Sequence, residues 1–173
     1  MRRRPGRLAP VLLACVLGGC GYHLSGHTTL LSPGIKTIGI PSFVNKTDRP
    51  ELEQRITAEV ISQFVTRGRY QTSSREDGVD AILRGEIFNY VQTPVAINAQ
   101  GRATRYEILI NARVSLVRAA DDKVLWQDDH FVFRRQYDVE VESLGLVSGE
   151  TAAIEEVAKD FAETVVTSIL EGF

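Results

Sequence analysis

Two segments of the chain carry apolar residues at the spacing of an amphipathic helix. The first covers roughly 50–67, with Pro50 just inside its start and Gly68 placed to end it. The second begins near Ser148, which is a predicted N-cap residue. Each stripe is wide enough to cover a hydrophobic core. The stripes consist of Leu52, Ile56, Val60, Ile61, Phe64 and Val65 in the first helix and of Ile154, Val157, Ala158, Phe161, Val165, Ile169 and Leu170 in the second.

Four other segments have the patterns of β-strands. The clearest is 106–117, where apolar residues occupy every second position and mostly polar residues lie between them. A tight turn over 119–123 joins this strand to the next one, so the two strands form a hairpin. The predicted strands cover 35–41, which Pro41 closes, 81–91, 106–117 and 124–137.

The predicted elements follow the order β-α-β-β-β-α. This order indicates an α+β fold, a two-layer sandwich with both helices packed on one face of a four-stranded sheet. The other sheet face keeps polar residues, with apolar residues such as Leu109 among them, and is therefore suited to contact with solvent or with a partner. The polar residues are Arg84, Glu86, Glu107, Asn111 and Arg113.

Length and composition are those of one globular domain. The chain has 173 residues, of which 43% are hydrophobic and 24% are charged. The first nineteen residues hold four arginines and no acidic residue, so their removal leaves 20 − 4 = 16 basic and 22 acidic residues, a net charge of −6. An acidic body argues against bulk binding of nucleic acid, because such binding depends on neutralising phosphates.

The N-terminal segment has the features of a bacterial secretion signal. Arginines precede an apolar stretch from Leu8 to Leu17, which is shorter than the roughly 20 residues that span a bilayer. Leu17-Gly18-Gly19-Cys20 resembles a lipobox, whose cysteine receives acyl chains such as palmitate and becomes the first mature residue. The alternatives are an ordinary signal peptide and a short buried helix. The four arginines at its start make the buried helix a poor fit.

The chain is therefore expected to have three parts, a signal peptide over 1–19, a lipidated tether over 20–34 and a single α+β domain over 35–173. Cys15 would leave with the signal, so no cysteine pair remains for a disulfide. Multiple acyl chains anchor a protein stably to a membrane. Gly21 follows the acylated cysteine, and by resemblance to enterobacterial sorting it is compatible with the outer membrane.

Residues suited to catalysis or metal binding are sparse. His23 and His27 lie four residues apart in the tether, and His130 follows Asp128 and Asp129. Adjacent residues of a strand point to opposite faces, which disfavours a metal site at His130. The sequence has neither a phosphate-binding glycine loop nor a nucleophile or H-E-x-x-H motif. We therefore expect a protein that is not an enzyme and needs no cofactor or metal.

The connection over 92–105 is the segment most informative about binding. Its simplest interpretation is a mobile link between two strands. It also combines arginines with exposed apolar residues, which fits an anionic amphiphile because guanidinium groups match phosphate geometry. Antiparallel pairing of the last two strands would bring the connection close to the end of the last strand. The candidate contacts are therefore Arg102, Arg105, Arg134 and Arg135.

Several short motifs resemble the lipopolysaccharide-assembly lipoprotein family LptE, and together they extend over nearly the whole chain from Cys20 onward. The most specific is Cys20-Gly-Tyr-His-Leu24, directly after the signal. The others are Ile35 to Pro41 with Phe43 and Asn45, Arg67-Gly-Arg-Tyr70, Asp80-Ala-Ile-Leu-Arg-Gly85 and Gly101-Arg-Ala-Thr-Arg-Tyr106.

The resemblance implies an outer-membrane lipoprotein that faces the periplasm and sits in the lumen of the β-barrel LptD. There it would plug the barrel, support its assembly and help deliver lipopolysaccharide to the outer leaflet. Family members contact lipopolysaccharide through basic residues, and Arg102 and Arg105 lie in the corresponding stretch. Two other hypotheses stay open, a periplasm-facing lipoprotein that binds peptidoglycan or another envelope protein, and a hydrolase with a cryptic site.

Overall fold

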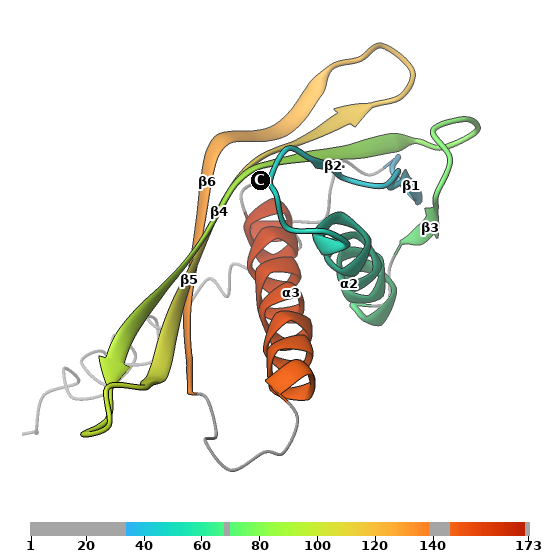
Figure 1. The fold of residues 1–173 in the computed structure, drawn as a ribbon. Coiled ribbons are helices and arrows are strands. Elements are labelled where there is room, and N and C mark those ends of the chain that lie inside the picture. Colours follow the sequence, from blue (N-terminus) through green and yellow to red (C-terminus); the bar gives the residue numbers. More distant parts are fainter. Residues whose placement is uncertain (1–33, 68–69, 139–145, 172–173) are drawn as a thin grey trace, which may run out of the picture.

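Two helices lie beside a long, twisted sheet (Figure 1). The computed structural model describes residues 34–67, 70–138 and 146–171, except for the side chains of 146–152. The predicted signal peptide, the predicted acylation site Cys20 and the part of the predicted tether before Gly34 lie outside the described residues. The strands are β1 (Thr37–Gly39), β2 (Val44–Asn45), β3 (Gln71–Ser73), β4 (Ala81–Ile97), β5 (Ala103–Arg118) and β6 (Val124–Asp138), and the helices are α2 (Leu52–Thr66) and α3 (Leu146–Glu171).

The sheet is mixed and has six strands. Its order is β3-β1-β4-β5-β6, and β2 also pairs with β4. The pairs of β1 with β3 and β4, and of β2 with β4, are parallel, whereas β4, β5 and β6 are antiparallel. The α+β class is confirmed, but the prediction of four strands was wrong. The two additional strands, β2 and β3, have two and three residues, too few for a period of two to be recognised in the sequence.

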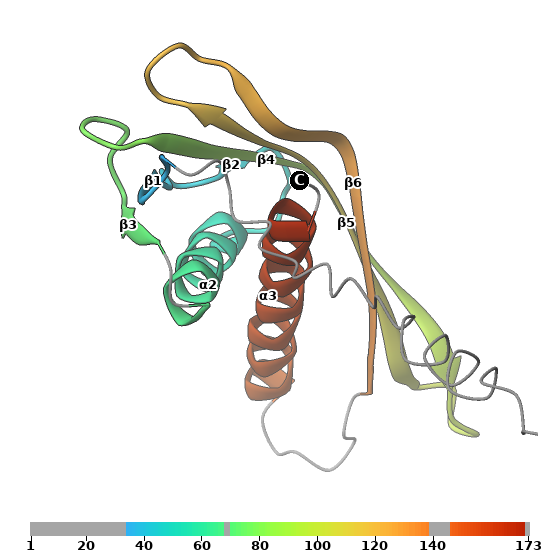
Figure 2. The same ribbon diagram turned by 180° about the vertical axis from the view of Figure 1, so that it is seen from behind.

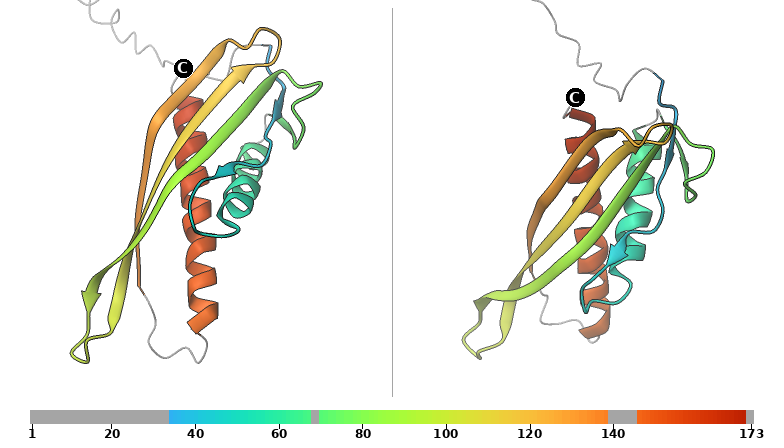
Figure 3. Two further views of the ribbon diagram at one scale, coloured as in Figure 1. Left: turned by 45° about the horizontal axis from the view of Figure 1, so that its top comes forward. Right: turned by 90° about the horizontal axis from the view of Figure 1, so that it is seen from above.

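The hairpin of β4 and β5 is longer than the sequence predicts. The strands expected to end at 91 and to begin at 106 instead end at Ile97 and begin at Ala103, so most of the predicted connection is strand. Pro94 is tolerated because the pairing of β4 with β1 and β2 stops at Ile87, which leaves that side of β4 unpaired farther on. Figure 3 shows the tip of this hairpin projecting beyond both helices.

Both predicted helices are present with small differences at their ends. α2 begins at Leu52 rather than at 50, and α3 begins at Leu146, so that Ser148 lies inside the helix and is not its N-cap. Val65 was expected on the core stripe but is 54% exposed, because it lies about 100° around the helix from buried Phe64. Neither described helix combines the length and apolar character needed to cross a membrane.

The core lies between the two helices and one face of the sheet (Figure 2). Every second residue of β5 from Ile108 to Leu116 is buried there, as the alternation predicts. Phe161 of α3 makes edge-to-face contacts with Phe131 and Phe133 of β6, with ring centroids 5.2 and 5.7 Å apart. Such pairs stabilise a core beyond the burial of their area. The prediction that both helices pack on one sheet face is correct.

Phe43 fixes the segment that leads from β1 to α2. Its buried ring lies directly over Gly85 of β4, where a Cβ atom would collide with the ring. The backbone N–H of Phe43 donates to Oγ1 of Thr57 in α2 at 3.0 Å. Gly85 thus allows a close approach that joins β4, the segment around Phe43 and α2.

Gly85→Ala should lower the free energy of unfolding by about 1–3 kcal/mol, because the added methyl group overpacks the site and displaces the Phe43 ring. Gly34→Ala is the matched control, since a Cβ there meets nothing within 4 Å. Chemical denaturation of both variants measures the difference. Equal stability of the two variants would contradict the close packing of Phe43 on Gly85.

Candidate functional site

The candidate arginines lie at the end of the sheet that is far from β1 and β3. Arg102 is in the turn between β4 and β5, Arg105 is in β5, and Arg134 and Arg135 are in β6. The register of β5 and β6 places Arg105 opposite Asp138. The structure therefore brings the two segments together, as the antiparallel hairpin predicts.

The four arginines do not share one face. Arg105 and Arg134 are on the outer face, away from the helices, whereas Arg135 is on the helix face. The two Nη atoms of Arg135 lie 3.4 Å from Glu156 Oε1 and 3.1 Å from Asp160 Oδ2 in α3. Asp160 Oδ2 accepts no aligned hydrogen bond, so this contact is an ion pair. Because consecutive strand residues point to opposite faces, Arg135 holds α3 and does not join Arg134.

The two outer-face arginines already have acidic partners. Arg105 Nε donates to Asp138 Oδ1 at 2.7 Å, and Arg134 Nε lies 3.7 Å from Glu107 Oε1. The hydrogen bond between Arg105 and Asp138 lowers the pKa of the aspartate and raises that of the arginine. Exposed ion pairs of this kind are weak and are screened by salt. These arginines can therefore exchange their carboxylates for a phosphate group at little cost.

Arg102 stands at the tip of the hairpin. Its backbone N–H donates to Asn98 Oδ1 at 2.9 Å, and Gly101, with a φ of 75°, provides the left-handed residue of the turn. Within the described part of the chain, no carboxylate pairs with the Arg102 guanidinium. Among the four candidates, Arg102 thus has the charge that is most available to an external anion.

Polar side-chain pairs continue along the outer face towards the middle of the sheet. Arg113 Nη1 donates to Glu86 Oε1 at 2.7 Å, and its guanidinium lies 4.9 Å from the ring centroid of Phe88. Asn89 Nδ2 donates to Asn111 Oδ1 at 2.8 Å. The predicted half-polar outer face is confirmed. The apolar residues between these pairs include Val91, Leu109 and Val132.

The helix-facing side of the same end carries a tyrosine group that the sequence analysis missed. Tyr106 and Tyr137 stack with ring centroids 5.8 Å apart and ring planes 20° apart. Gln92 Nε2 donates to Tyr137 Oη at 2.7 Å, and Tyr90 Oη donates to Gln92 Oε1 at 3.4 Å. Alternation placed Tyr106 on this face, but the register that brings Tyr137 opposite it cannot be read from one sequence.

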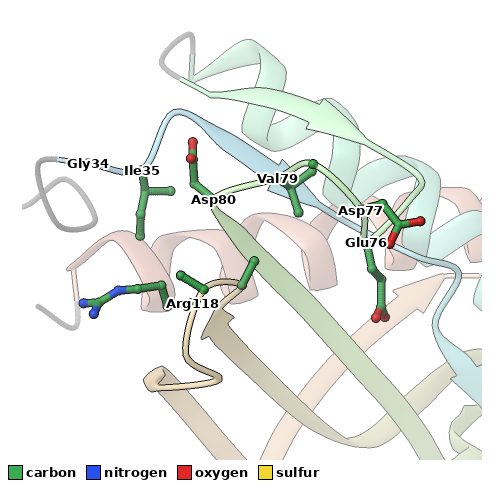
Figure 4. Close-up of a pocket in the computed structure, with 10 residues that line it drawn as sticks. Gly34, Ile35, Glu76, Asp77, Val79, Asp80 and Arg118 are labelled. Carbon is green, nitrogen blue, oxygen red and sulfur yellow. The ribbon is translucent and has the colours of Figure 1, made fainter.

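An open pocket of about 570 Å³ lies at the opposite end of the sheet (Figure 4). The Asp80 carboxylate in its wall accepts the N–H groups of Lys36 and Thr37, both at 2.8 Å, and these bonds lower the pKa of Asp80. Glu76 forms a two-point ion pair with Arg84. A lowered folded-state pKa means that the Asp80 contact stabilises the fold above about pH 4 and weakens as the pH falls through that pKa. These charges hold β1 and β4 in place.

His130 lies on an irregular part of β6. The register of β5 and β6 shifts between Ala112 and Val114, and the N–H of His130 donates to Asp128 Oδ1 at 2.8 Å. Over residues 34–67, 70–138 and 146–171, no group of three or more His, Cys, Asp or Glu side chains is placed to hold a metal ion. His23 and His27 lie outside the described residues.

A sequence model of the LptE family, described as lipopolysaccharide-assembly, matches residues 35–169. The chain belongs to the LptE family. The match includes all six strands and nearly all of both helices. No curated protein sequence matches the chain significantly.

Solved structures share the fold of this LptE-family chain at low sequence identity. A hypothetical protein from Chlamydia trachomatis has a TM-score of 0.55 and 7% identity, with 79% of this chain and 96% of that chain covered. A protein from Xanthomonas campestris has a TM-score of 0.53 and 12% identity, with coverages of 80% and 85%. An uncharacterized lipoprotein B from Nitrosomonas europaea has a TM-score of 0.49 and 17% identity, with coverages of 88% and 89%. The first two similarities show a shared fold.

Several of the residues that carry the resemblance to the LptE family have structural roles in this chain. Asn45 Nδ2 donates to Arg49 O at 2.7 Å and to Glu53 Oε2 at 2.8 Å, which ties the end of β2 to the start of α2. Asp80 holds the start of β1, and Gly85 accommodates an aromatic ring. Asn45, Asp80 and Gly85 therefore stabilise the fold. The residues left for contacts with other molecules are the candidate arginines and those of the outer sheet face.

Proposed function

We propose that this LptE-family chain is an outer-membrane lipoprotein, acylated at Cys20, that complexes with and plugs an LptD-type β-barrel. It supports assembly of the barrel and the transport and insertion of lipopolysaccharide into the outer leaflet. It acts by binding and positioning, without catalysis. The observation that carries the proposal is the family match over residues 35–169.

The outer sheet face is the proposed contact with the barrel. The helices cover the other face, so the outer face is left for a partner. A barrel lumen is polar, and a plug therefore needs charges that are already satisfied, as in the pair of Arg113 and Glu86. Val91 and Val132 are 42% and 55% exposed and would be buried against the barrel wall. This combination of paired charges and exposed valines supports a protein-covered surface.

The proposed lipopolysaccharide contact lies next to this face, at Arg102, Arg105 and Arg134. Arg102 offers a guanidinium group without an acidic partner in the described part of the chain, and the other two exchange carboxylates for lipid phosphates. Arg135 contributes indirectly, because its ion pairs with α3 hold the end of β6.

A photo-crosslinking amino acid at Val132, on the outer face, is expected to give a product with a large outer-membrane barrel in intact cells. The matched control is Val65 on α2, whose exposed fraction of 54% nearly equals the 55% of Val132. Gel shift and mass spectrometry identify the product. A barrel product from Val65 alone, or none from either position, would rule out the outer face as the interface.

Combined Arg102→Glu and Arg105→Glu substitutions should weaken lipopolysaccharide binding at least about tenfold, since each charged hydrogen bond contributes about 1.5–3 kcal/mol. Arg75→Glu combined with Lys123→Glu, two exposed residues away from the candidate contact, changes the net charge by the same amount and is the control. A charge swap, Arg105→Asp with Asp138→Arg, keeps an ion pair between β5 and β6 but moves the positive charge from position 105 to position 138. Unchanged affinity of the double glutamate variant in a binding titration would defeat the assignment.

A further inference from the structure

The last strand of the sheet, β6, has one side without a strand partner. β5 pairs with one side of β6, and within the described residues no strand pairs with the other side (Figure 1). Over Val132–Asp138 the pairing with β5 is regular, because both register shifts lie nearer the start of β6. The outer side of such a strand presents a row of unpaired N–H and C=O groups, which can pair with another chain. We call the outer side of Val132–Asp138 the free edge.

The register identifies the backbone groups that point away from β5. The N–H of Lys46 donates to the carbonyl of Ile87 at 2.8 Å, so the backbone groups of Ile87 point to β2. Ala112 of β5 lies opposite both Ile87 and Phe131, and its backbone groups therefore point to β6. The direction alternates along a strand, so Phe131 and every second residue after it face β5. The exposed residues whose N–H and C=O groups point outward are Val132, Arg134 and Gln136.

Two other unpaired parts of the sheet are blocked. In the first half of β6, beside a register shift, the N–H of His130 already donates to the Asp128 carboxylate at 2.8 Å. The unpaired side of β4 carries Pro94, which has no N–H to donate. Proteins use prolines and bulges of this kind to prevent edge strands from pairing with other chains. The free edge of β6 has neither a proline nor a register shift, so it can accept a further strand.

The charges of the free edge disfavour a second copy of this chain as the added strand. Arg134 and Arg135 lie near the middle of the free edge. Antiparallel pairing of two copies would therefore place four arginines in neighbouring strands that are about 4.8 Å apart. Like charges on neighbouring strands destabilise their pairing. A segment of a different protein, with neutral or acidic side chains opposite the arginines, avoids this repulsion.

We infer that the free edge of β6 binds an extended segment of a partner protein, which becomes the seventh strand of the sheet. Each of the three outward residues offers one donor and one acceptor, in the spacing that an extended backbone matches. Strand addition of this kind derives its affinity from main-chain hydrogen bonds. It leaves the side chain of Arg134 on the outer face.

The identity of the partner rests on the proposed function. A barrel that covers the outer face at Val132 also reaches the free edge, because the free edge begins at the same residue. The strands of a barrel wall are themselves paired on both sides. The added segment is therefore a loop or a terminus of the barrel protein, and not one of its wall strands.

A proline at position 136 tests the pairing, because it removes an outward N–H and leaves the hydrogen bonds to β5 in place. The wild type and one variant are produced at equal levels in the same cells, and mass spectrometry counts the copies recovered on the extracted barrel. Gln136→Pro should be recovered about fivefold less than the wild type, or lower still. Gln136→Ala is the matched control and should compete equally, since both variants lose the side-chain bond to Glu107.

Amide hydrogen exchange tests the same edge without any substitution. In the isolated full chain, the N–H groups of Val132, Arg134 and Gln136 should exchange fast, whereas those of Phe133 and Arg135, which face β5, should exchange slowly. Binding of the barrel should slow the exchange of the three outward groups. This measurement also decides the question if Gln136→Pro does not fold, which circular dichroism verifies.

The inference is overturned by equal recovery of the proline variant and the wild type, by an equal loss for the alanine variant, or by outward amides that binding does not protect. Protection already present in the isolated chain also overturns it, and shows that this chain or a second copy covers the edge. A barrel cross-link at Val132 together with any of these results contradicts the inference alone. Strand addition by a protein other than a barrel contradicts the proposed function alone, and a chain without any protein partner contradicts both.

Discussion

Burial of one sheet face against two helices is the interaction on which the rest of the structure depends. Ile108, Ile110 and Leu116 of β5 are completely buried with Phe161 of α3, and each such side chain contributes about 1.5–3 kcal/mol. The helices do not extend as far as the tip of the β4–β5 hairpin (Figure 3). Beyond the helices, strand pairing and the stacked rings of Tyr106 and Tyr137 stabilise the sheet. A sheet that is longer than its helix layer gives the molecule a projecting end.

This one-sided core determines which residues remain available for binding. Side chains on the helix face are used for packing, so that Arg135 pairs with α3 although its neighbour Arg134 is on the outer face. Residues near β1, such as Asp80 and Gly85, position the short strands and the segment before α2. The side chains that remain available for binding are therefore those of the outer face and the hairpin tip, where ion pairs are exposed and weak.

The sequence predicts the parts of the fold that have a long regular period. Both helices and the strands β4, β5 and β6 follow from the spacing of apolar residues. The short strands β2 and β3 escape prediction because their positions depend on contacts with β4 and β1, which are distant in sequence. The extension of β4 past Pro94 was also missed, since a proline indicates the end of a strand unless one side of that strand is known to be unpaired. The arginines could be placed near one another, but the ion pairs of Arg105 and Arg134 required the structure.

Native mass spectrometry of the chain, extracted in mild detergent from the envelope of its own cells, tests most directly whether another protein covers the outer sheet face. A barrel-sized partner in fixed stoichiometry, one barrel for each copy of this chain, is the expected result. Recovery of the chain by itself, under conditions that keep other envelope complexes intact, would contradict an enclosed outer face.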